Sequence, residues 1–456
     1  MALSVNQASV GGACICLDLG TAMSKASVRL DPHGEDVAPL PIGAAAGAEH
    51  ALLTPSAMYV DADRLFFGPP ALKRAETGVA SRRNPIVSFK MILSARDVEA
   101  ALTAKFSRSI DPTGTLRYRD GLVLYLAYLD QLIRAAVALE DSLAPPIANA
   151  PRRLTSPHWQ SFDAAGRLIG HLVDESVAVS ADLGVALLSD EGVEMVRVRQ
   201  ALDRAANARD SGYFDGIVFE SLSAASAYAN FARATAPLVL VIDMGAGTTD
   251  IAAFERDSTV APSGLAEIRG SRQCCTLAGD ELDNILIDLL VRSSGTRNLD
   301  AQDKLWRAVK LSARALKQEL FQKGKSAFKN KVANLRVSRE ALANDQAFRD
   351  YCKALTQAIA ASLIPLAERA KHTDAQAITV LLAGGGSNLP FLADLVKAAA
   401  VKAKLKLPLK VERFGANWTL PHRRHPFAGV FPQLAIAMGG ALAPVVRFTA
   451  PAPELA

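Results

Sequence analysis

The sequence has 456 residues, of which 50% are apolar, 21% charged and 6% aromatic, and its formal net charge is +5. This composition is typical of a globular protein with a large core, and it excludes a disordered chain or a disulfide-stapled scaffold. Much of the positive charge is local, because residues 301–340 hold eleven Lys or Arg against three Asp or Glu. The charge pattern therefore argues against general nucleic-acid binding.

Cysteine content and apolar runs exclude further classes. The five cysteines are an odd number and show no pair of CxxC motifs, so we expect reduced thiols in a cytoplasmic protein. The first 24 residues contain no Lys or Arg, which argues against a signal peptide. No uninterrupted apolar run reaches about 18 residues, so we expect no membrane span.

Two segments of similar sequence are predicted to form β-hairpins. Residues 14–24 and 238–250 each begin as an apolar, β-rich run that ends in Asp-x-Gly and continues through turn residues. A second alternating stretch follows, at 27–30 and at 251–254. This pattern is typical of a strand, a tight turn and a returning strand. Because the hairpins start about half a chain length apart, we predict two similar units in tandem.

The other predicted elements alternate between helices and strands, which favours α/β sheets covered on both faces. In chain order they are a helix at 119–140, helices with short turns across 160–210, a strand at 216–220, a helix at 222–234, helices at 301–322 and 345–371, a strand at 378–382, a helix at 390–402 and a small-residue helix at 434–443. The Pro/Ala-rich segment from Thr449 is predicted to be loose.

Three glycine-containing loops each follow an apolar strand, namely Asp18–Thr21, Asp243–Asp250 and Gly384–Gly386. Glycine lets backbone N–H groups approach a phosphate, hydroxyls hold its oxygens, and carboxylates hold Mg²⁺ through its waters. The third loop also precedes a helix, whose N-terminus favours an anion. One such loop would be an ordinary strand-end turn, but three in this order predict a nucleotide site.

The order of these loops resembles the actin-like ATPase superfamily, and within it the nucleotide-binding domain of the 70-kDa heat-shock (DnaK-type) chaperones. Three further stretches carry the resemblance. Leu53–Gly68 resembles the family's TPS…RLIG strand pair, Asn84–Lys90 resembles its NP…FxxK segment, and Leu277–Asn284 resembles GGEDFDN. The resemblance runs from about 14 to 445 and is weak across 95–215 and 320–375.

The resemblance implies an α/β fold of duplicated actin-like (ribonuclease-H-like) lobes around a central nucleotide cleft. The expected first lobe spans 1–235, with a subdomain insertion at about 36–140 and a helical insertion at about 160–210. The expected second lobe spans 236–445, with an insertion at about 280–375, and 446–456 form a loose tail. No part of the sequence resembles the client-binding domain of the chaperones.

The resemblance also implies roles for individual residues. Asp18 and Asp243 match the carboxylates that organise Mg²⁺ through water. Lys90 matches the catalytic lysine that places the attacking water or the γ-phosphate, and Glu220 matches a glutamate on a crossing helix. These four form the expected catalytic set. The residues that match nucleotide contacts are Gly20, Thr21, Ser24, Gly245, Ala246, Gly247, Thr248, Arg314, Gly384, Gly385, Gly386 and Ser387.

The sequence departs from the family pattern at a few positions. Ala22 and Ala246 replace a Thr and a Gly of the phosphate loops, and both changes keep the backbone donors. Ser221 replaces a proline that is tied to interdomain signalling in the chaperones. With Arg314 aligned to the arginine that stacks on adenine, Lys310 and Ala313 stand where a Glu and a Lys would clamp the nucleoside.

The implied function is Mg²⁺-dependent binding and slow hydrolysis of ATP by a chaperone-like protein that acts as a nucleotide-gated conformational switch. The expected ligands are ATP or ADP and Mg²⁺. The expected partner is a protein or client in trans, a homo-oligomer stays open, and neither membrane nor nucleic acid is expected. The alternatives are a sugar-type kinase with Asp250 as general base, an actin-like filament-forming ATPase, and a nucleotide sensor without catalysis.

Overall fold

A computed structural model describes residues 12–31, 36–61, 63–77, 83–158, 162–206, 208, 211–232, 235–257, 259, 264–329, 333–415, 418 and 429–446. The chain divides into two compact units. Unit 1 comprises Met1–Ala234, Ser258–Gly264 and Asn417–Ala456, and unit 2 comprises Thr235–Asp257 and Leu265–Ala416. The predicted loose segment from Thr449 lies outside the described residues.

Unit 1 is built on a mixed sheet whose centre is the first predicted hairpin. The spatial order is β10 (Phe214–Phe219), β8 (Arg152–Ser156), β1 (Cys14–Asp18), β2 (Met23–Arg29) and β3 (Val37–Leu40), and the short β4 (Thr54–Pro55) also pairs with β2. Strands β1, β2 and β3 are antiparallel, whereas β8 runs parallel to β1 and β10 runs parallel to β8. The first hairpin is therefore confirmed.

A second, smaller sheet in unit 1 has the order β7 (Ile86–Val87), β5 (Ala57–Val60), β6 (Arg64–Phe67) and β9 (Val193–Glu194). Its face packs Tyr59 and Phe66 against Ala71 and Ala75 of α2 (Gly68–Thr77). The other helical elements of unit 1 are α1 (Ile42–Ala45), η2 (Phe89–Ser94), α3 (Val98–Thr103), α4 (Tyr118–Leu139), η3 (Pro145–Asn149), α5 (Phe162–Leu183), η4 (Gly184–Leu188), α6 (Met195–Ala205), α7 (Glu220–Phe231) and α13 (Phe431–Leu442).

Helix α4 confirms the helix predicted at 119–140. Among the described helices it alone is long and apolar enough to cross a bilayer, and 78% of its most apolar window is buried inside the protein. Its whole midsection from Gly121 to Ile133 is buried. This pattern is typical of a core helix, because neighbouring elements cover it on all sides and it needs no polar face.

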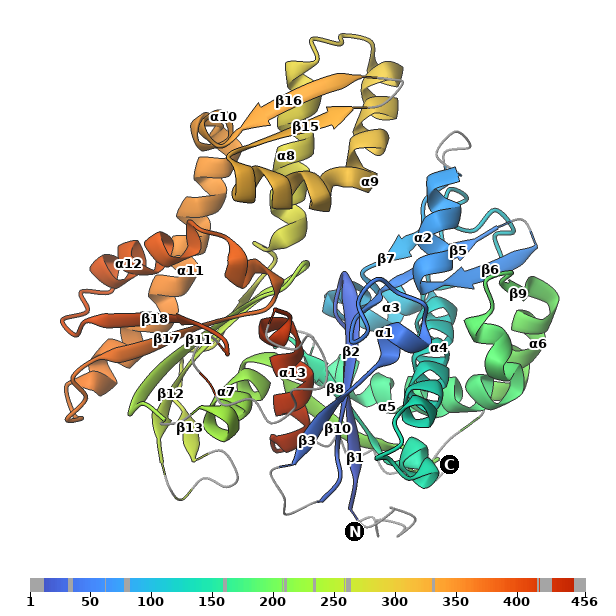
Figure 1. The fold of residues 1–456 in the computed structure, drawn as a ribbon, viewed down its shortest axis with the longest axis horizontal. Helices are drawn as coiled ribbons and strands as arrows, with labels where there is room; N and C mark the ends of the chain where they lie inside the picture. Colours follow the sequence, from blue (N-terminus) through green and yellow to red (C-terminus); the bar gives the residue numbers. More distant parts are fainter. Residues whose placement is uncertain are drawn as a thin grey trace. The chain divides into compact units, whose positions relative to one another are not determined.

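Unit 2 repeats the sheet of unit 1. Its order is β13 (Leu265–Glu267), β12 (Thr249–Arg256), β11 (Leu238–Met244), β17 (Ile378–Ala383) and β18 (Leu409–Arg413), and β14 (Gln273–Cys275) also pairs with β12. The hairpin strands are antiparallel, while β17 and β18 extend the sheet in parallel. The same strand directions in both units confirm the predicted duplicated α/β fold (Figure 1).

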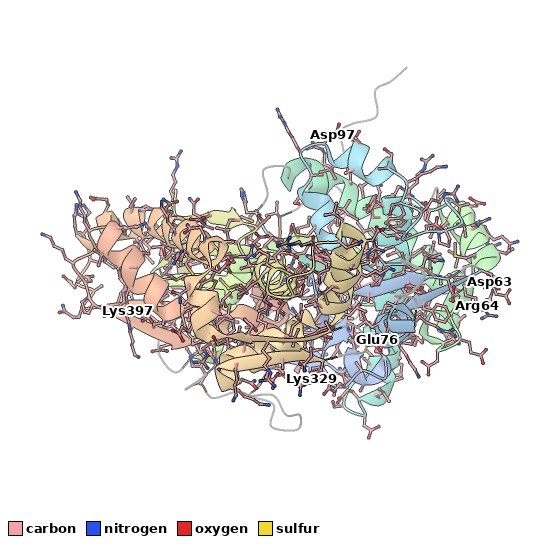
Figure 2. The ribbon with its side chains drawn as sticks, turned by 90° about the horizontal axis from the view of Figure 1, so that it is seen from above. Asp63, Arg64, Glu76, Asp97, Lys329 and Lys397 are labelled. Atoms are coloured by element: carbon pink, nitrogen blue, oxygen red, sulfur yellow. The ribbon has the colours of Figure 1, made fainter. Side chains whose placement is uncertain are left out.

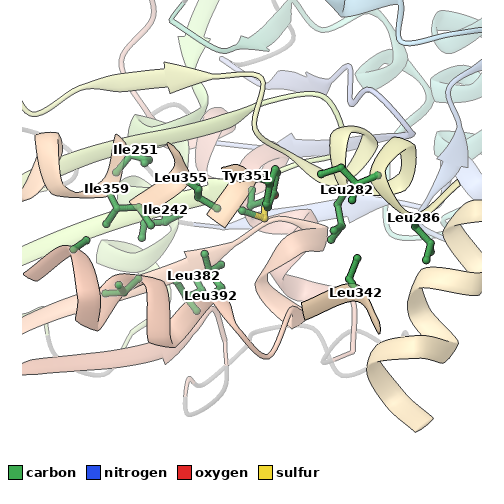
Figure 3. Packing of buried hydrophobic residues seen from close by; sticks show 14 of the residues in the cluster. Ile242, Ile251, Leu282, Leu286, Leu342, Tyr351, Leu355, Ile359, Leu382 and Leu392 are labelled. Carbon is green, nitrogen blue, oxygen red and sulfur yellow. The ribbon is translucent and has the colours of Figure 1, made fainter. Parts of the chain in front are cut away.

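The helices of unit 2 are α8 (Gly279–Ser293), α9 (Leu299–Lys323), α10 (Arg339–Asn344), α11 (Gln346–Ala370) and α12 (Leu392–Lys402), with the short η5 (Gly385–Asn388). Helices α8 to α10 and the hairpin of β15 (Lys325–Lys329) and β16 (Asn334–Ser338) are drawn in yellow to light orange in Figure 1. Figure 3 shows the core, where Leu355 and Ile359 of α11 lie beside Ile242 and Ile251 of the sheet.

Helix α13 differs from the expected lobe boundary, which placed residues up to 445 with the second lobe. The structure puts it in unit 1, packed on α7 and on β1, β2, β3 and β8. Small residues bring the two helices together, since a Cβ on Gly439 would overlap the carbonyl oxygen of Ser223. Arg153 also donates to Ala441 O and Ala443 O, both at 3.0 Å, and so satisfies carbonyls at the C-terminal end of α13.

Candidate functional site

The turn of the first hairpin carries a buried ion pair. Asp18, the last residue of β1, stands directly opposite Lys25 of β2 in the antiparallel ladder, so the two side chains share a face of the sheet. The Lys25 Nζ lies 2.5 Å from Asp18 Oδ2. It also lies 3.1 Å from where a Cβ on Gly20 would be, and that Cβ would overlap Met23 O. Gly20 thus lets the turn close directly over the lysine ammonium.

Lys90 and Glu220 meet at the same carboxylate. Glu220 is the first residue of α7, and Lys90 lies in η2 just after Ser88, whose φ is +67°. The Lys90 ammonium pairs with Glu220 Oε1 and lies 3.8 Å from Asp18 Oδ1. Thr155 donates its hydroxyl to the same Asp18 oxygen at 3.0 Å. Three residues that the sequence places at 18, 90 and 220 therefore form one buried cluster.

The charges of this cluster shift two pKa values in opposite directions. Burial raises the pKa of Asp18, but Lys25 and then Lys90 outweigh it, so the pKa lies below the usual aspartate value. Burial raises the pKa of Glu220, and Lys90, shared with Asp18, compensates only part of that effect. Asp18 is consequently the more firmly ionised of the two carboxyl groups.

The two hydroxyls predicted in this turn are both buried. Ser24 is fully buried, and its Oγ hydrogen-bonds Ser56 Oγ at 2.8 Å and Tyr125 OH at 3.0 Å. Ser56 in turn donates to Gly20 O at 2.6 Å. Ser24 therefore ties the turn to Ser56, which follows β4, and to α4, and the phosphate contact predicted for it stays a prediction. Thr21, 6% exposed, lies in the turn itself.

The second hairpin places two carboxylates where the first has an ion pair. Asp243, near the end of β11, stands directly opposite Asp250 of β12, and both residues are buried. Gly245 N donates to Thr248 O at 2.9 Å and closes the turn, with Ala246 and Gly247 at its tip. Two carboxylates on facing positions repel each other, so this pair favours a cation between them.

The glycine loop at 384–387 lies against this hairpin. Strand β17 pairs with β11 so that Ala383 is opposite Asp243. Gly384 has φ +74°, and a Cβ there would lie 2.5 Å from Asp243 Oδ1 and would overlap Met244 O. Gly385 is exposed with open space around its Cα, and Ser387 donates its hydroxyl to Gly384 O at 2.8 Å. Only glycine at 384 lets the loop approach the Asp243 turn.

Helices α8 and α9 support the other side of the same turn. Gly279 N and Asp280 N, at the start of α8, donate to Gly245 O and Ala246 O at 3.2 and 2.7 Å. Lys317 of α9 donates to Gly279 O at 2.9 Å and pairs with Asp283 at 3.0 Å. Burial raises the pKa of Asp280 and of Asp283, and Lys317 opposes both shifts.

Arg314 lies one turn before Lys317 on α9, and its side chain is exposed. It is also among the cations that act on the Asp280 and Asp283 carboxyl groups. Unit 2 thus places the turn at 243–248 between the glycine loop at 384–387 and the start of α8, and the charge of Arg314 acts on Asp280 and Asp283 at that helix start.

The two hairpins fit a divalent cation differently. Within the residues that the structure describes, no group of three or more His, Cys, Asp and Glu side chains could hold a metal ion. Mg²⁺ needs no such cage, because it commonly binds one or two carboxylates together with phosphates and waters. Asp243 and Asp250 fit this donor set. Asp18 Oδ2 accepts from Lys25 and Asp18 Oδ1 accepts from Thr155, and each oxygen keeps a second acceptor site, so the water-mediated metal role of Asp18 stays a prediction.

Two sheets of one duplicated topology, each with an Asp-x-Gly hairpin at its centre, are consistent with an actin-like two-lobe fold. The model of the family described as Hsp70 protein matches residues 210–407. The match and the fold together support an Hsp70-type, actin-like nucleotide-binding domain. No curated protein matches the chain.

Sequence reasoning missed Lys25, Thr155 and Lys317. The returning strand was predicted to begin at 27, but β2 begins at Met23, so Lys25 was left in the turn. An antiparallel register counted from the Asp-x-Gly turn would have placed it opposite Asp18. Thr155 gave no such signal, because its position depends on the parallel pairing of β8 with β1. Lys317 stood one helical turn beyond Arg314, on the same side of the predicted helix.

Proposed function

We propose that the protein binds ATP and ADP with Mg²⁺, hydrolyses ATP slowly, and uses the bound nucleotide as a conformational switch for a separate protein partner. The observation that carries this proposal is the cluster of Asp18, Lys90 and Glu220. The resemblance to Hsp70-type domains assigned catalytic roles to these residues. Their convergence from three distant segments supports that assignment.

The chemistry would be phosphoryl transfer to water, which depends on positioning and charge neutralisation rather than on a covalent intermediate. Lys90 is suited to positioning, because burial and its pairing with Glu220 hold its ammonium in place. The turn at 245–248, with backbone N–H groups and Thr248, would hold phosphate oxygens. Mg²⁺, when bound, would neutralise charge on the phosphates, and Asp243 and Asp250 would hold it through water.

The switch part of the proposal rests on helices α7 and α13. Glu220 of the catalytic cluster is the first residue of α7, and α7 packs closely on α13. A change of ligand at Lys90 and Glu220 can thus act directly on this helix pair. We also propose that the protein acts in the cytoplasm, where its five free cysteines would stay reduced.

The first experiment is thermal unfolding with and without saturating Mg·ATP. A ligand at one hundred times its Kd stabilises the native state by about 2.7 kcal/mol, so we expect a clear rise in Tm. Phosphate release measured on the same sample then tests hydrolysis. An unmoved Tm together with no phosphate release would contradict the proposal.

A double variant tests the catalytic assignment without leaving a buried charge unpaired. Lys90→Met with Glu220→Gln removes both members of the ion pair, and we expect nucleotide binding to remain while hydrolysis falls about 10²-fold or more. The matched control is Lys397→Met with Asp394→Asn on α12, an exposed pair at 3.1 Å; Lys397 is labelled in Figure 2. Hydrolysis at the wild-type rate in the first variant would remove Lys90 from the mechanism.

Three outcomes would favour another function or no switch. Phosphate transfer to a sugar in an acceptor screen, above an ATP-only blank, would make the protein a kinase. Nucleotide-dependent pelleting would make it filament-forming. Hydrogen exchange at 220–231 and 431–442 tests the switch, and identical exchange with ADP and with a non-hydrolysable ATP analogue, without a nucleotide-dependent partner, would contradict it.

A further inference from the structure

Tyr125, on the buried midsection of α4, contacts both segments of unit 1 that surround the Asp18 cluster. Its side chain is fully buried. The ring stacks on the ring of Phe89, with the two centroids 4.3 Å apart and the ring planes inclined by 7°. The hydroxyl lies 3.0 Å from the Oγ of Ser24. One side chain therefore joins the segment of Lys90 to the turn that follows Asp18.

The ring contact holds the backbone from which Lys90 extends. Phe89 directly precedes Lys90 in η2, and its side chain is buried. Ser88, one residue earlier, has φ +67°, a left-handed conformation that is strained for a residue other than glycine. Such a backbone persists only where its surroundings hold it. The stacking of Phe89 on Tyr125 provides that support one residue away from the strained position.

The hydroxyl of Tyr125 stands at one end of a hydrogen-bonded chain that reaches the turn. Ser24 Oγ lies 3.0 Å from Tyr125 OH and 2.8 Å from Ser56 Oγ, and Ser56 donates to Gly20 O at 2.6 Å. The carbonyl of Pro55, at 3.2 Å, is a further acceptor for Tyr125 OH. Three hydroxyl protons serve these four contacts, and the direction from Tyr125 through the two serines to Gly20 O serves the three shortest. Burial raises the pKa of Tyr125 to about 12, so its hydroxyl stays protonated and able to donate at neutral pH.

The last hydrogen bond of this chain orients the predicted phosphate turn. The carbonyl of Gly20 and the N–H of Thr21 belong to one planar peptide unit, in which they point in opposite directions. Because Ser56 holds the Gly20 carbonyl, it also fixes the direction of the Thr21 N–H. A backbone N–H that is already oriented costs no reorganisation when it meets a phosphate oxygen.

We propose that Tyr125 is a positioning residue for ATP hydrolysis, which holds the Lys90 ammonium and the Thr21 N–H in a fixed arrangement. The reaction itself rests on the proposed function, whereas the link between the two segments rests on the geometry of unit 1. Tyr125 acts through Phe89 on one side and through Ser24 on the other. The two contacts can therefore be removed one at a time.

The first test compares the ATPase kinetics of Tyr125→Phe and Tyr128→Phe. Tyr125→Phe keeps the stacked ring and removes the hydroxyl next to Ser24, so we expect kcat to fall about tenfold while KM changes less than about threefold. Tyr128 is the matched control, because it is also buried, lies one turn further along α4, and has its hydroxyl 3.4 Å from Thr54 Oγ1. Tyr128→Phe should keep the wild-type kcat. Equal kcat values for the two variants, or a rise in KM alone for Tyr125→Phe, would overturn the proposal.

The second test measures hydrogen exchange of the nucleotide-free protein at 20–25 and 88–94. Loss of one buried contact should speed local exchange about fivefold, at 20–25 in Tyr125→Phe and at 88–94 in Phe89→Leu. Tyr125→Leu removes both contacts and should speed exchange in both segments, and Tyr128→Phe should speed it in neither. Exchange at the wild-type rate in both segments of Tyr125→Leu would overturn the proposal. If Tyr125→Leu does not fold, wild-type exchange in both Tyr125→Phe and Phe89→Leu would overturn it.

The two tests separate this inference from the proposed function. If the wild-type protein releases no phosphate from ATP, the proposed function fails, and the exchange comparison alone decides whether Tyr125 holds the two segments together. If the wild type hydrolyses ATP and Tyr125→Phe behaves as Tyr128→Phe does, the proposed function stands and Tyr125 is not a positioning residue.

Discussion

The hairpins β1–β2 and β11–β12 occupy the same place in two sheets of the same topology, yet the residue opposite the buried aspartate differs between them. In the first hairpin Lys25 compensates Asp18 within the protein. In the second, Asp250 faces Asp243, so the directly opposite side chain is another carboxylate. One residue across the ladder thus sets the charge beside the aspartate of each turn.

The two turns are also held in place by different kinds of contact. Side-chain hydroxyls of Ser24, Ser56 and Tyr125 tie the first turn to its own unit. Backbone groups hold the second, through Gly279 N donating to Gly245 O and through the close approach of Gly384. The first turn is therefore held by side chains, and the second is held by backbone groups.

Replacing Lys25, the residue opposite Asp18, should have the largest effect on stability. Lys25→Asp gives the first hairpin the charge pattern of the second, and it buries a third carboxylate beside Asp18 and Glu220. We expect a loss of at least about 3–5 kcal/mol in the free energy of unfolding, measured by urea denaturation. Lys397→Asp, at an exposed site, is the control and should change stability by less than about 0.5 kcal/mol. A loss below about 1 kcal/mol for Lys25→Asp would show that Lys25 does not compensate Asp18.

The second prediction concerns the other lysine of the balanced cluster. Lys90→Met leaves Glu220 buried without its ion-pair partner, so we expect a loss of about 3 kcal/mol. Lys90→Met with Glu220→Gln should recover more than half of that loss. A double-mutant cycle by urea denaturation measures the coupling. Strictly additive single effects would mean that the two side chains do not stabilise each other.

A glycine pair in unit 2 tests how closely the second turn is held. Gly384→Ala places a Cβ at φ +74° against Asp243 and Met244, so we expect a loss of about 1–3 kcal/mol and weaker nucleotide binding. Gly385→Ala meets open space and should leave both properties within error. Thermal unfolding and nucleotide titration of the two variants provide the measurement. Equal behaviour of the two alanines would remove the requirement for glycine at 384.

The smallest expected effect is on pH dependence. The pKa of Asp18 is lowered in the folded state, so Asp18 adds stability above its unfolded pKa of about 3.9, and this stability is lost as the pH falls through the folded pKa. Glu220, with a raised pKa, contributes with the opposite sign, and its contribution is lost as the pH rises through its folded pKa.

Lys25→Met with Asp18→Asn should therefore lose less stability than wild type between about pH 4 and pH 2. Urea denaturation across this range measures the difference. If the free energy of unfolding falls equally in the two proteins between about pH 4 and pH 2, the pKa of Asp18 is not lowered by folding.

Much of the local structure followed from the sequence. Both hairpins, helix α4 (118–139), helix α11 (346–370) and strand β17 (378–383) lie where apolar periodicity and turn residues predicted them. The segment at 84–90 was identified only by its resemblance, and the structure placed its lysine beside Asp18 and Glu220. The full set of Asp18 partners could not be predicted from the sequence, because Thr155 reaches Asp18 only through the parallel pairing of β8 with β1.

The sequence by itself determined the periodic elements and the turns, because side-chain pattern and glycine placement act over a few residues. Only the tertiary structure decided which charges meet, that Ser24 turns inward, and that α13 joins unit 1. These outcomes depend on register and on close packing between distant segments. The free energies of pairing and burial that select them are properties of the assembled neighbours rather than of any single stretch of chain.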